Sequence, residues 1–187
     1  MKMSRFGIVG FLIVIIGLTS CGQKKQQSTT DIISDGWKTF ETADYSIRYP
    51  VTWAFDNSGH SGVILQIFSA QTSVEDNFRE NVNLVIQDLS GQKVQTLDQY
   101  TQLSESQIKM FMTDSEILSS DKLTKDGQEY QKVIFTAVQG QFNLKSEQYY
   151  LIKGHLAYVL TLTCTKDTYD SYCEVGEKIM DSFKTVK

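Results

Sequence analysis

Four consecutive stretches of β-strand pattern in the second half of the chain constrain its fold more than any other feature. Tight-turn signals separate them, at Asp126-Gly127, Gln139-Gly140 and Gly154. The Asp-Gly pair is the strongest signal, because both residues accept the positive φ angles of a two-residue hairpin. Strands joined this closely pair with their neighbours in antiparallel order. We therefore expect a meander of strands at residues 116–123, 128–139, 142–153 and 156–165.

The last strand of this meander is apolar on both faces. One face carries Leu156, Tyr158, Leu160, Leu162 and Cys164, and the other carries Ala157 and Val159 together with three threonines. A strand with one face in water alternates apolar and polar residues, so this pattern predicts a sheet that is covered on both sides. Two amphipathic segments, at residues 97–112 and 168–183, are expected to supply the covering helices.

Each expected helix has one apolar side. Thr96 and Gln99 form a capping-box pattern at the start of the first helix. Its stripe consists of Leu97, Tyr100, Ser104, Ile108 and Phe111. The stripe of the closing helix consists of Tyr169, Tyr172, Cys173, Gly176, Ile179, Met180 and Phe183. Shorter strands are expected before the first helix, at residues 37–41, 45–49, 63–69 and 81–88.

The N-terminus has the pattern of a bacterial lipoprotein signal. Lys2 and Arg5 precede an apolar run at residues 6–18, which is shorter than the ~20 residues that a membrane-spanning helix needs. The run ends in Leu18-Thr19-Ser20-Cys21, which matches a lipobox. Cys21 would carry the lipid, become the mature N-terminus and hold the protein on the outer face of the cell membrane or at the outer membrane. The alternative is an ordinary N-terminal anchor with an accidental cysteine.

The remaining chain divides into a tether and one domain. Residues 21–36 are polar and lack periodicity, which is typical of a flexible segment, and residues 37–187 suit a single domain. Removal of residues 1–20 takes away two of the 18 basic residues and none of the 22 acidic ones, so the mature net charge is near −6. Such a surface repels phosphate backbones, and we expect no nucleic-acid partner.

Two cysteines remain after lipidation, Cys164 and Cys173. Both lie on the apolar side of an expected element, in a compartment that favours oxidation. They are a candidate disulfide pair, and the alternative is that both fill the core as free thiols.

No catalytic or metal-binding constellation stands out. Gly59-His60-Ser61-Gly62 is the nearest pattern to a nucleophile turn, but Val63 stands where its second glycine should fall. His60 and His155 lie apart, without metal-ligand spacing. Glu75, Asp76 and Glu80 are more typical of a solvated loop than of a cation site. We expect no catalytic residue, no metal and no cofactor. Tyr149, Tyr150 and Tyr158 either belong to the core or line a pocket for an apolar ligand.

Six fragments between Trp37 and Val186 carry a family resemblance. They are Tyr45-Ser46-Ile47-Arg48-Tyr49-Pro50-x-x-Trp53, Phe68-Ser69, Asp76-x-Phe78-x-Glu80-Asn81-Val82-Asn83-Leu84, Thr96-Leu97-Asp98-Gln99-Tyr100, Ala157-Tyr158-Val159-Leu160-Thr161 and Met180-Asp181-Ser182-Phe183. In order and spacing they resemble the PsbP-like superfamily, which includes bacterial DcrB-type lipoproteins. The resemblance implies an α+β fold, an α/β/α sandwich with a mainly antiparallel sheet, and no shared catalytic residues. Ala70 departs from the proline common after Phe-Ser, and the short tether does not support a photosynthetic role.

These observations lead to one functional hypothesis and one alternative. The first is a lipid-anchored, non-catalytic accessory protein that binds or stabilises an envelope protein complex. The alternative is an extracytoplasmic carrier that holds a small apolar ligand between sheet and helix, for which a cavity of a few hundred cubic ångströms is the discriminating feature.

Overall fold

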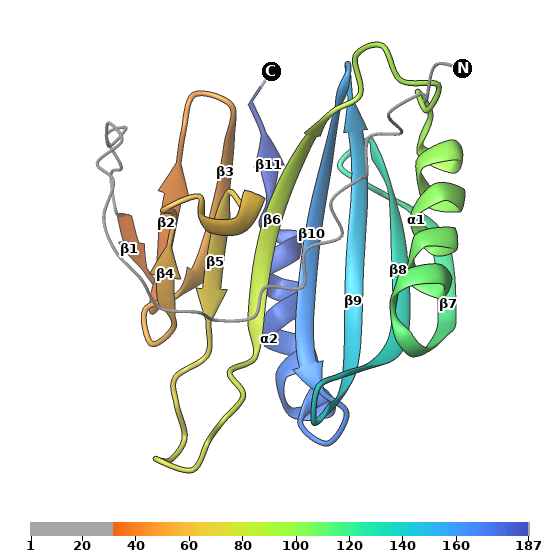
Figure 1. Cartoon of the computed structure of the whole chain (residues 1–187). Helices are drawn as coiled ribbons and strands as arrows, with labels where there is room; N and C mark the ends of the chain where they lie inside the picture. The colour runs from red at the N-terminus through yellow and green to blue at the C-terminus, as the bar shows by residue number, and fades with distance from the viewer. Residues whose placement is uncertain (1–31, 187) are drawn as a thin grey trace.

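Two antiparallel sheets and two α-helices make up the fold of residues 32–186, the part of the chain that the computed structural model describes (Figure 1). The small sheet has the strand order β1-β2-β3-β11 and consists of β1 (Ile32–Ser34), β2 (Trp37–Glu41), β3 (Tyr45–Pro50) and β11 (Lys184–Thr185). The large sheet has the order β4-β5-β6-β10-β9-β8-β7 and begins with β4 (Ala54–Asp56), β5 (Leu65–Phe68) and β6 (Asn81–Asp88). The predicted α+β class with antiparallel pairing is confirmed.

The predicted meander forms the rest of the large sheet. Its strands are β7 (Thr113–Lys125), β8 (Gln128–Gln139), β9 (Phe142–Lys153) and β10 (Leu156–Thr165). At the first hairpin Lys125 pairs with Gln128, and the two turn residues have φ angles of 50° at Asp126 and 78° at Gly127. The sequence signal for this turn was therefore correct. β10 lies between β6 and β9, which makes it the central strand of the sheet.

The two helices cover opposite faces of the large sheet. Figure 1 shows α1 (Leu97–Phe111) in front of the β7–β8 side of the sheet and α2 (Tyr169–Asp181) behind the sheet along β10. α1 contacts β7, β8 and β9. α1 begins at the predicted capping box, because Gln99 N donates to Thr96 Oγ1 at 3.2 Å and Thr96 N donates to Gln99 Oε1 at 3.3 Å. The prediction that both faces are covered is confirmed.

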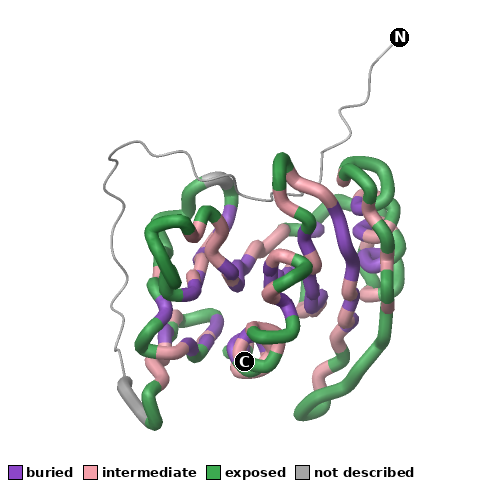
Figure 2. Tube along the Cα trace, turned by 90° about the horizontal axis from the view of Figure 1, so that it is seen from below, coloured by how far each residue is buried: buried purple, intermediate pink, exposed green. Residues whose placement is uncertain are grey.

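Two hydrophobic clusters fill the spaces on either side of the large sheet. The larger one joins the small sheet, α2 and the even-numbered positions of β10, and the smaller one lies under α1. Figure 2 shows the buried segments toward the interior and the exposed ones along loops and hairpin tips. Within the described residues, both clusters lie between Trp37 and Phe183.

Three expectations differ from the structure. Phe111 does not pack under α1 but is 64% exposed, because the helix ends there and the chain turns into β7. Residues 32–34 do not belong to a flexible tether, since they form β1 and pair with β2. The small sheet as a separate layer was not predicted.

Within the described residues, no helix is long and apolar enough to cross a membrane.

Candidate functional site

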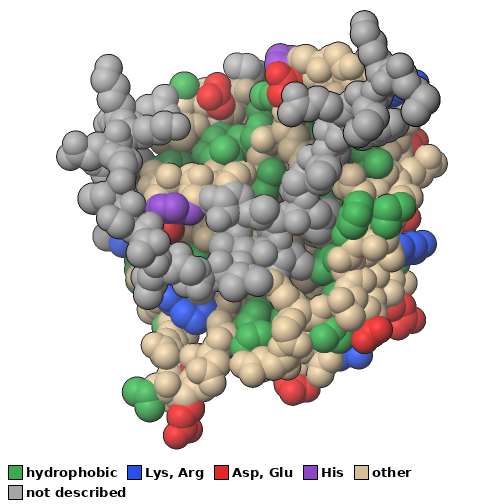
Figure 3. All heavy atoms as spheres, viewed as in Figure 1, with side chains coloured by type: hydrophobic (Ala, Val, Ile, Leu, Met, Phe, Trp, Pro, Cys, Tyr) green, Lys and Arg blue, Asp and Glu red, His purple; other side chains and the backbone are tan. Residues whose placement is uncertain are grey.

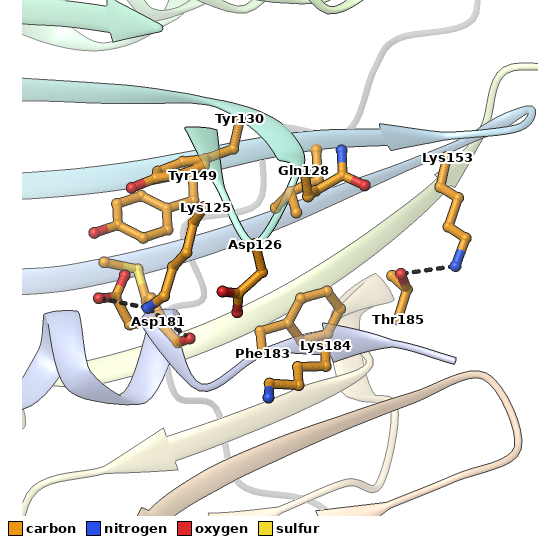
Figure 4. Close-up of a pocket in the computed structure, with 12 residues that line it drawn as sticks. Lys125, Asp126, Gln128, Tyr130, Tyr149, Lys153, Asp181, Phe183, Lys184 and Thr185 are labelled. Atoms are coloured by element: carbon orange, nitrogen blue, oxygen red, sulfur yellow. Dashed lines mark hydrogen bonds and ion pairs between the residues drawn. The ribbon is translucent and has the colours of Figure 1, made fainter. Parts of the chain in front are cut away.

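A pocket of about 360 Å³ opens where the β7–β8 hairpin faces the segment between α2 and β11. The lining residues come from four places: the hairpin tip, β9, the end of α2 and β11. They are Lys125, Asp126, Gln128, Tyr130, Tyr149, Leu151, Lys153, Met180, Asp181, Phe183, Lys184 and Thr185. Figure 4 shows them converging on one space. Its volume falls within the range of small-molecule sites.

Aromatic and aliphatic side chains form the inner surface of this pocket. The rings of Tyr130 and Tyr149 lie 4.8 Å apart, centroid to centroid, in a tilted pair. Leu151 follows Tyr149 on the same face of β9, and Met180 and Phe183 are buried on the opposite side. Burial and the nearby Glu147 and Asp181 raise the pKa of Tyr149, so its phenol stays neutral.

Two lysines bridge the pocket at its ends. Lys125 Nζ lies 2.9 Å from the Asp181 carboxylate and donates to the Asp181 carbonyl oxygen at 3.1 Å, which ties the hairpin to the C-terminal end of α2. Lys153 Nζ donates to Thr185 Oγ1 at 2.9 Å and to the Val186 carbonyl oxygen at 2.8 Å. These two hydrogen bonds connect β9 to β11 and to the residue that follows it. Figure 4 shows these bridges at opposite ends of the pocket.

A buried charge cluster adjoins the aromatic end. Glu147 is fully buried, accepts a hydrogen bond from Tyr169 Oη at 2.8 Å and has Lys132 Nζ 3.1 Å from its Oε1. Lys132 also donates to Glu177 at 2.6 Å and lies 5.8 Å from the Tyr149 ring centroid. Burial raises the pKa of Glu147 despite these contacts. Burial lowers the pKa of Lys132, but its two carboxylate partners outweigh this and leave it raised.

The loop carboxylates do not form a site together. Glu80 is buried and accepts hydrogen bonds from Ser69 Oγ at 3.1 Å and Thr168 Oγ1 at 2.6 Å, so it joins β6 to the start of α2. Asp76 is half-buried and accepts hydrogen bonds from Thr72 within its own loop, and these hydrogen bonds lower its pKa. Across the described residues, no group of three or more histidine, cysteine or acidic side chains has the geometry to hold a metal ion.

The two histidines lie apart on exposed turns. His60 begins a short 3-10 turn, His60–Gly62, and its Nδ1 hydrogen-bonds with Ser58 Oγ. His155 belongs to the β9–β10 turn after Gly154, as predicted, and its carbonyl oxygen accepts from Leu89 N at 2.7 Å. Neither ring contributes to the pocket.

The predicted site residues have different outcomes. Cys164 and Cys173 are free thiols that belong to the same core region, Cys164 buried and Cys173 half-buried, and their pairing stays a prediction. Tyr150 and Tyr158 are core residues, whereas Tyr149 also lines the pocket. Cys21 lies outside the described residues.

Sequence reasoning missed most of the pocket. Its lysines and aspartates come from segments far apart in the chain, and Lys125 and Asp181 are 56 residues apart. The one usable signal was the alternation Tyr149, Leu151 and Lys153, which places three pocket residues on one face of a strand.

Residues 35–185 match the PsbP family. No curated protein matches the chain by sequence.

Several solved structures share the fold at low sequence identity. Cyanobacterial PsbP (CyanoP) from Synechocystis matches with a TM-score of 0.61 and 14% identity, over 86% of this chain and 98% of that one. LpqN of Mycobacterium tuberculosis, described as involved in cell envelope biogenesis, matches with a TM-score of 0.61 and 12% identity, over 81% and 91%. The Ran-binding protein Mog1p of Saccharomyces cerevisiae matches with a TM-score of 0.52 and 10% identity, over 87% and 97%. At these identities the likeness establishes the fold alone.

Proposed function

Because the chain belongs to the PsbP family over residues 35–185, we propose that it is a lipid-anchored accessory protein of the bacterial cell envelope. It binds or stabilises a protein complex outside the cytoplasm. The observation that carries this proposal is the lipobox at residues 18–21 directly ahead of a PsbP domain. LpqN, which shares the fold, is described as involved in cell envelope biogenesis, and this supports an envelope role.

The proposed role is non-catalytic. The two buried carboxylates, Glu80 and Glu147, are both engaged in contacts that join α2 to the large sheet. In Figure 3 the visible Lys and Arg side chains are scattered among Asp and Glu side chains, and this mixture supports a protein partner over a nucleic acid. A DcrB-type role remains part of this proposal.

Crosslinking in cells followed by co-purification tests the partner. The protein carries an affinity tag after Lys187, and Cys21→Ser serves as the matched control because it removes the proposed anchor and leaves the domain unchanged. We expect one or more envelope proteins to be recovered with the wild type and depleted with the variant. Recovery of the lipoprotein alone under several growth conditions would contradict the proposal.

A second candidate function is supported by the pocket. The cavity of about 360 Å³, lined by Tyr130, Tyr149 and Phe183, supports an extracytoplasmic carrier of a small ligand. Saturable binding of a small apolar probe, neutral or charged, tests this candidate, and the failure of every such probe to bind would remove it.

A further inference from the structure

The pocket lining changes in chemical character along β9. Tyr149, Leu151 and Lys153 occupy alternate positions of one strand and therefore share a face. At ~3.3 Å per residue, their backbone positions extend over about 13 Å. The pocket floor is thus aromatic at one end, aliphatic in the middle and cationic at the other end.

The charges on the rim are distributed unevenly. Lys125 and Asp181 form an ion pair at the aromatic end and neutralise each other. Asp126 projects from the hairpin tip on the side of that pair, as Figure 4 shows. Lys153 stands at the other end. Its bonds within the described part of the chain go to a hydroxyl and a carbonyl oxygen, and neither is a carboxylate.

We infer that the pocket binds a small amphipathic anion. Its apolar body, a ring or an alkyl chain, lies over Leu151 and the Tyr130–Tyr149 pair, and its carboxylate, phosphate or sulfonate group meets Lys153. An ammonium group has three donors, and among the described residues Thr185 and Val186 accept two of them, which leaves one donor for the ligand. Exposed Lys184 also lines the pocket and has no ion pair within the described chain.

Asp126 limits where the anion can sit. A negative group placed beside the hairpin tip would meet the Asp126 carboxylate, whereas one placed at the Lys153 end would not. The aspartate therefore orients the ligand with its charged group toward β11. This inference rests on the carrier function proposed above and adds the chemical class of the ligand.

Two fluorescent probes of similar apolar size test the inference. One is the anion 8-anilino-1-naphthalenesulfonate, and the other is the neutral N-phenyl-1-naphthylamine. Both are titrated into the Cys21→Ser protein. We expect saturable binding of both, and ¹H–¹⁵N shift changes at Leu151 and Lys153 that locate them in the pocket.

Lys153→Gln separates charge from shape, because glutamine keeps a donor for Thr185. We expect it to weaken binding of the sulfonate by about threefold to fivefold, the size of one solvent-exposed ion pair, and to leave the neutral probe unchanged. Leu151→Trp, which narrows the cavity, should weaken both probes. Lys109→Gln, at an exposed position of α1, is the matched control and should affect the binding of neither probe.

The outcomes distinguish the ligand class from the carrier function. Equal effects of Lys153→Gln and Lys109→Gln on sulfonate binding, with the neutral probe still bound, overturn the anion assignment and leave the carrier function standing. No saturable binding of either probe overturns both. Only variants whose melting temperature equals that of the wild type are compared, because partly unfolded protein would also bind the probes.

Discussion

Gly176 of α2 lies directly against the side chain of Leu162 on β10. A Cβ atom at position 176 would fall 2.5 Å from Leu162 Cδ2 and 2.6 Å from Cδ1, closer than such atoms approach in folded proteins. Leu162 is fully buried at the centre of the large sheet. The absent side chain of Gly176 therefore sets how closely the helix approaches the sheet.

Gly176→Ala is expected to destabilise the domain by about 1–2 kcal/mol. Overpacking a closed core costs roughly 1–3 kcal/mol, and the better helix propensity of alanine returns up to about 1 kcal/mol. Urea unfolding of the variant measures the net change. Ser171→Ala on the exposed side of α2 is the control and should be neutral or slightly stabilising. Adding Leu162→Ala should reduce the cost of Gly176→Ala, and full additivity of the two changes would contradict a direct contact.

Glu147→Gln should change how stability depends on pH. Burial raises the pKa of Glu147 in the folded protein above its ordinary value of 4.5, so the fold favours the protonated acid. The stability that this gives is fully present below about pH 4.5 and is lost as pH rises through the folded-state pKa. Glutamine stays neutral throughout. The variant should therefore gain free energy of unfolding relative to wild type between pH 4 and pH 8, and a constant difference would contradict the raised pKa.

Lys132→Met tests the same cluster from the other side. Removing the cation leaves the Glu147 carboxylate buried without its ion-pair partner, and loss of one partner of a buried pair costs about 3–5 kcal/mol. We expect a loss of this order at pH 7 and a smaller loss at pH 4, where Glu147 is protonated. Denaturant unfolding at both values measures it. In the Glu147→Gln background the effect of Lys132→Met should shrink, and an unchanged effect would assign it to Glu177 instead.

The two free thiols should react at different rates. Burial raises the pKa of Cys164, while Cys173 is half-buried on α2. Alkylation of the native, unreduced protein should therefore modify Cys173 first and Cys164 only after unfolding, as intact mass and peptide mapping would show. If neither reacts before reduction and both react after it, the two cysteines form a disulfide.

Cys21→Ser should release the protein from the membrane without unfolding it. Stable anchoring requires two or more acyl chains, and the serine variant cannot receive them. Fractionation should move the variant from the membrane pellet to the soluble fraction, with the melting temperature of the domain unchanged. Variant protein that stays in the pellet after a salt wash would show that the apolar segment or a partner holds it there.

Local signals made most of the fold predictable. The Asp126-Gly127 turn and the Thr96–Gln99 capping box each act within a few residues, and both are present in the structure. The stripe of α2 was also correct at Tyr169, Gly176 and Met180, because helical spacing alone places them on one side.

Long-range contacts made the rest unpredictable. β11 has two residues, and its Lys184 pairs with Ser46 of β3. The sequence of neither strand indicates that it pairs with the other. The pocket depends on this strand and on the Lys125–Asp181 ion pair, so its shape exists only in the assembled fold. Phe111 was misplaced because its spacing continues the apolar stripe while the helix itself stops.

Because β3 pairs with β11, the small sheet can close only after the C-terminal end of the chain is available. Arg48 N donates to Ser182 Oγ at 2.8 Å across 134 residues of sequence. A chain that emerges N-terminus first presents β3 long before β11, so one edge of the small sheet stays unpaired while the meander and α2 follow. Incompletely folded chains aggregate through such unpaired strand edges. An anchor at Cys21 would keep each such intermediate at the membrane surface and apart from its neighbours until β11 arrives.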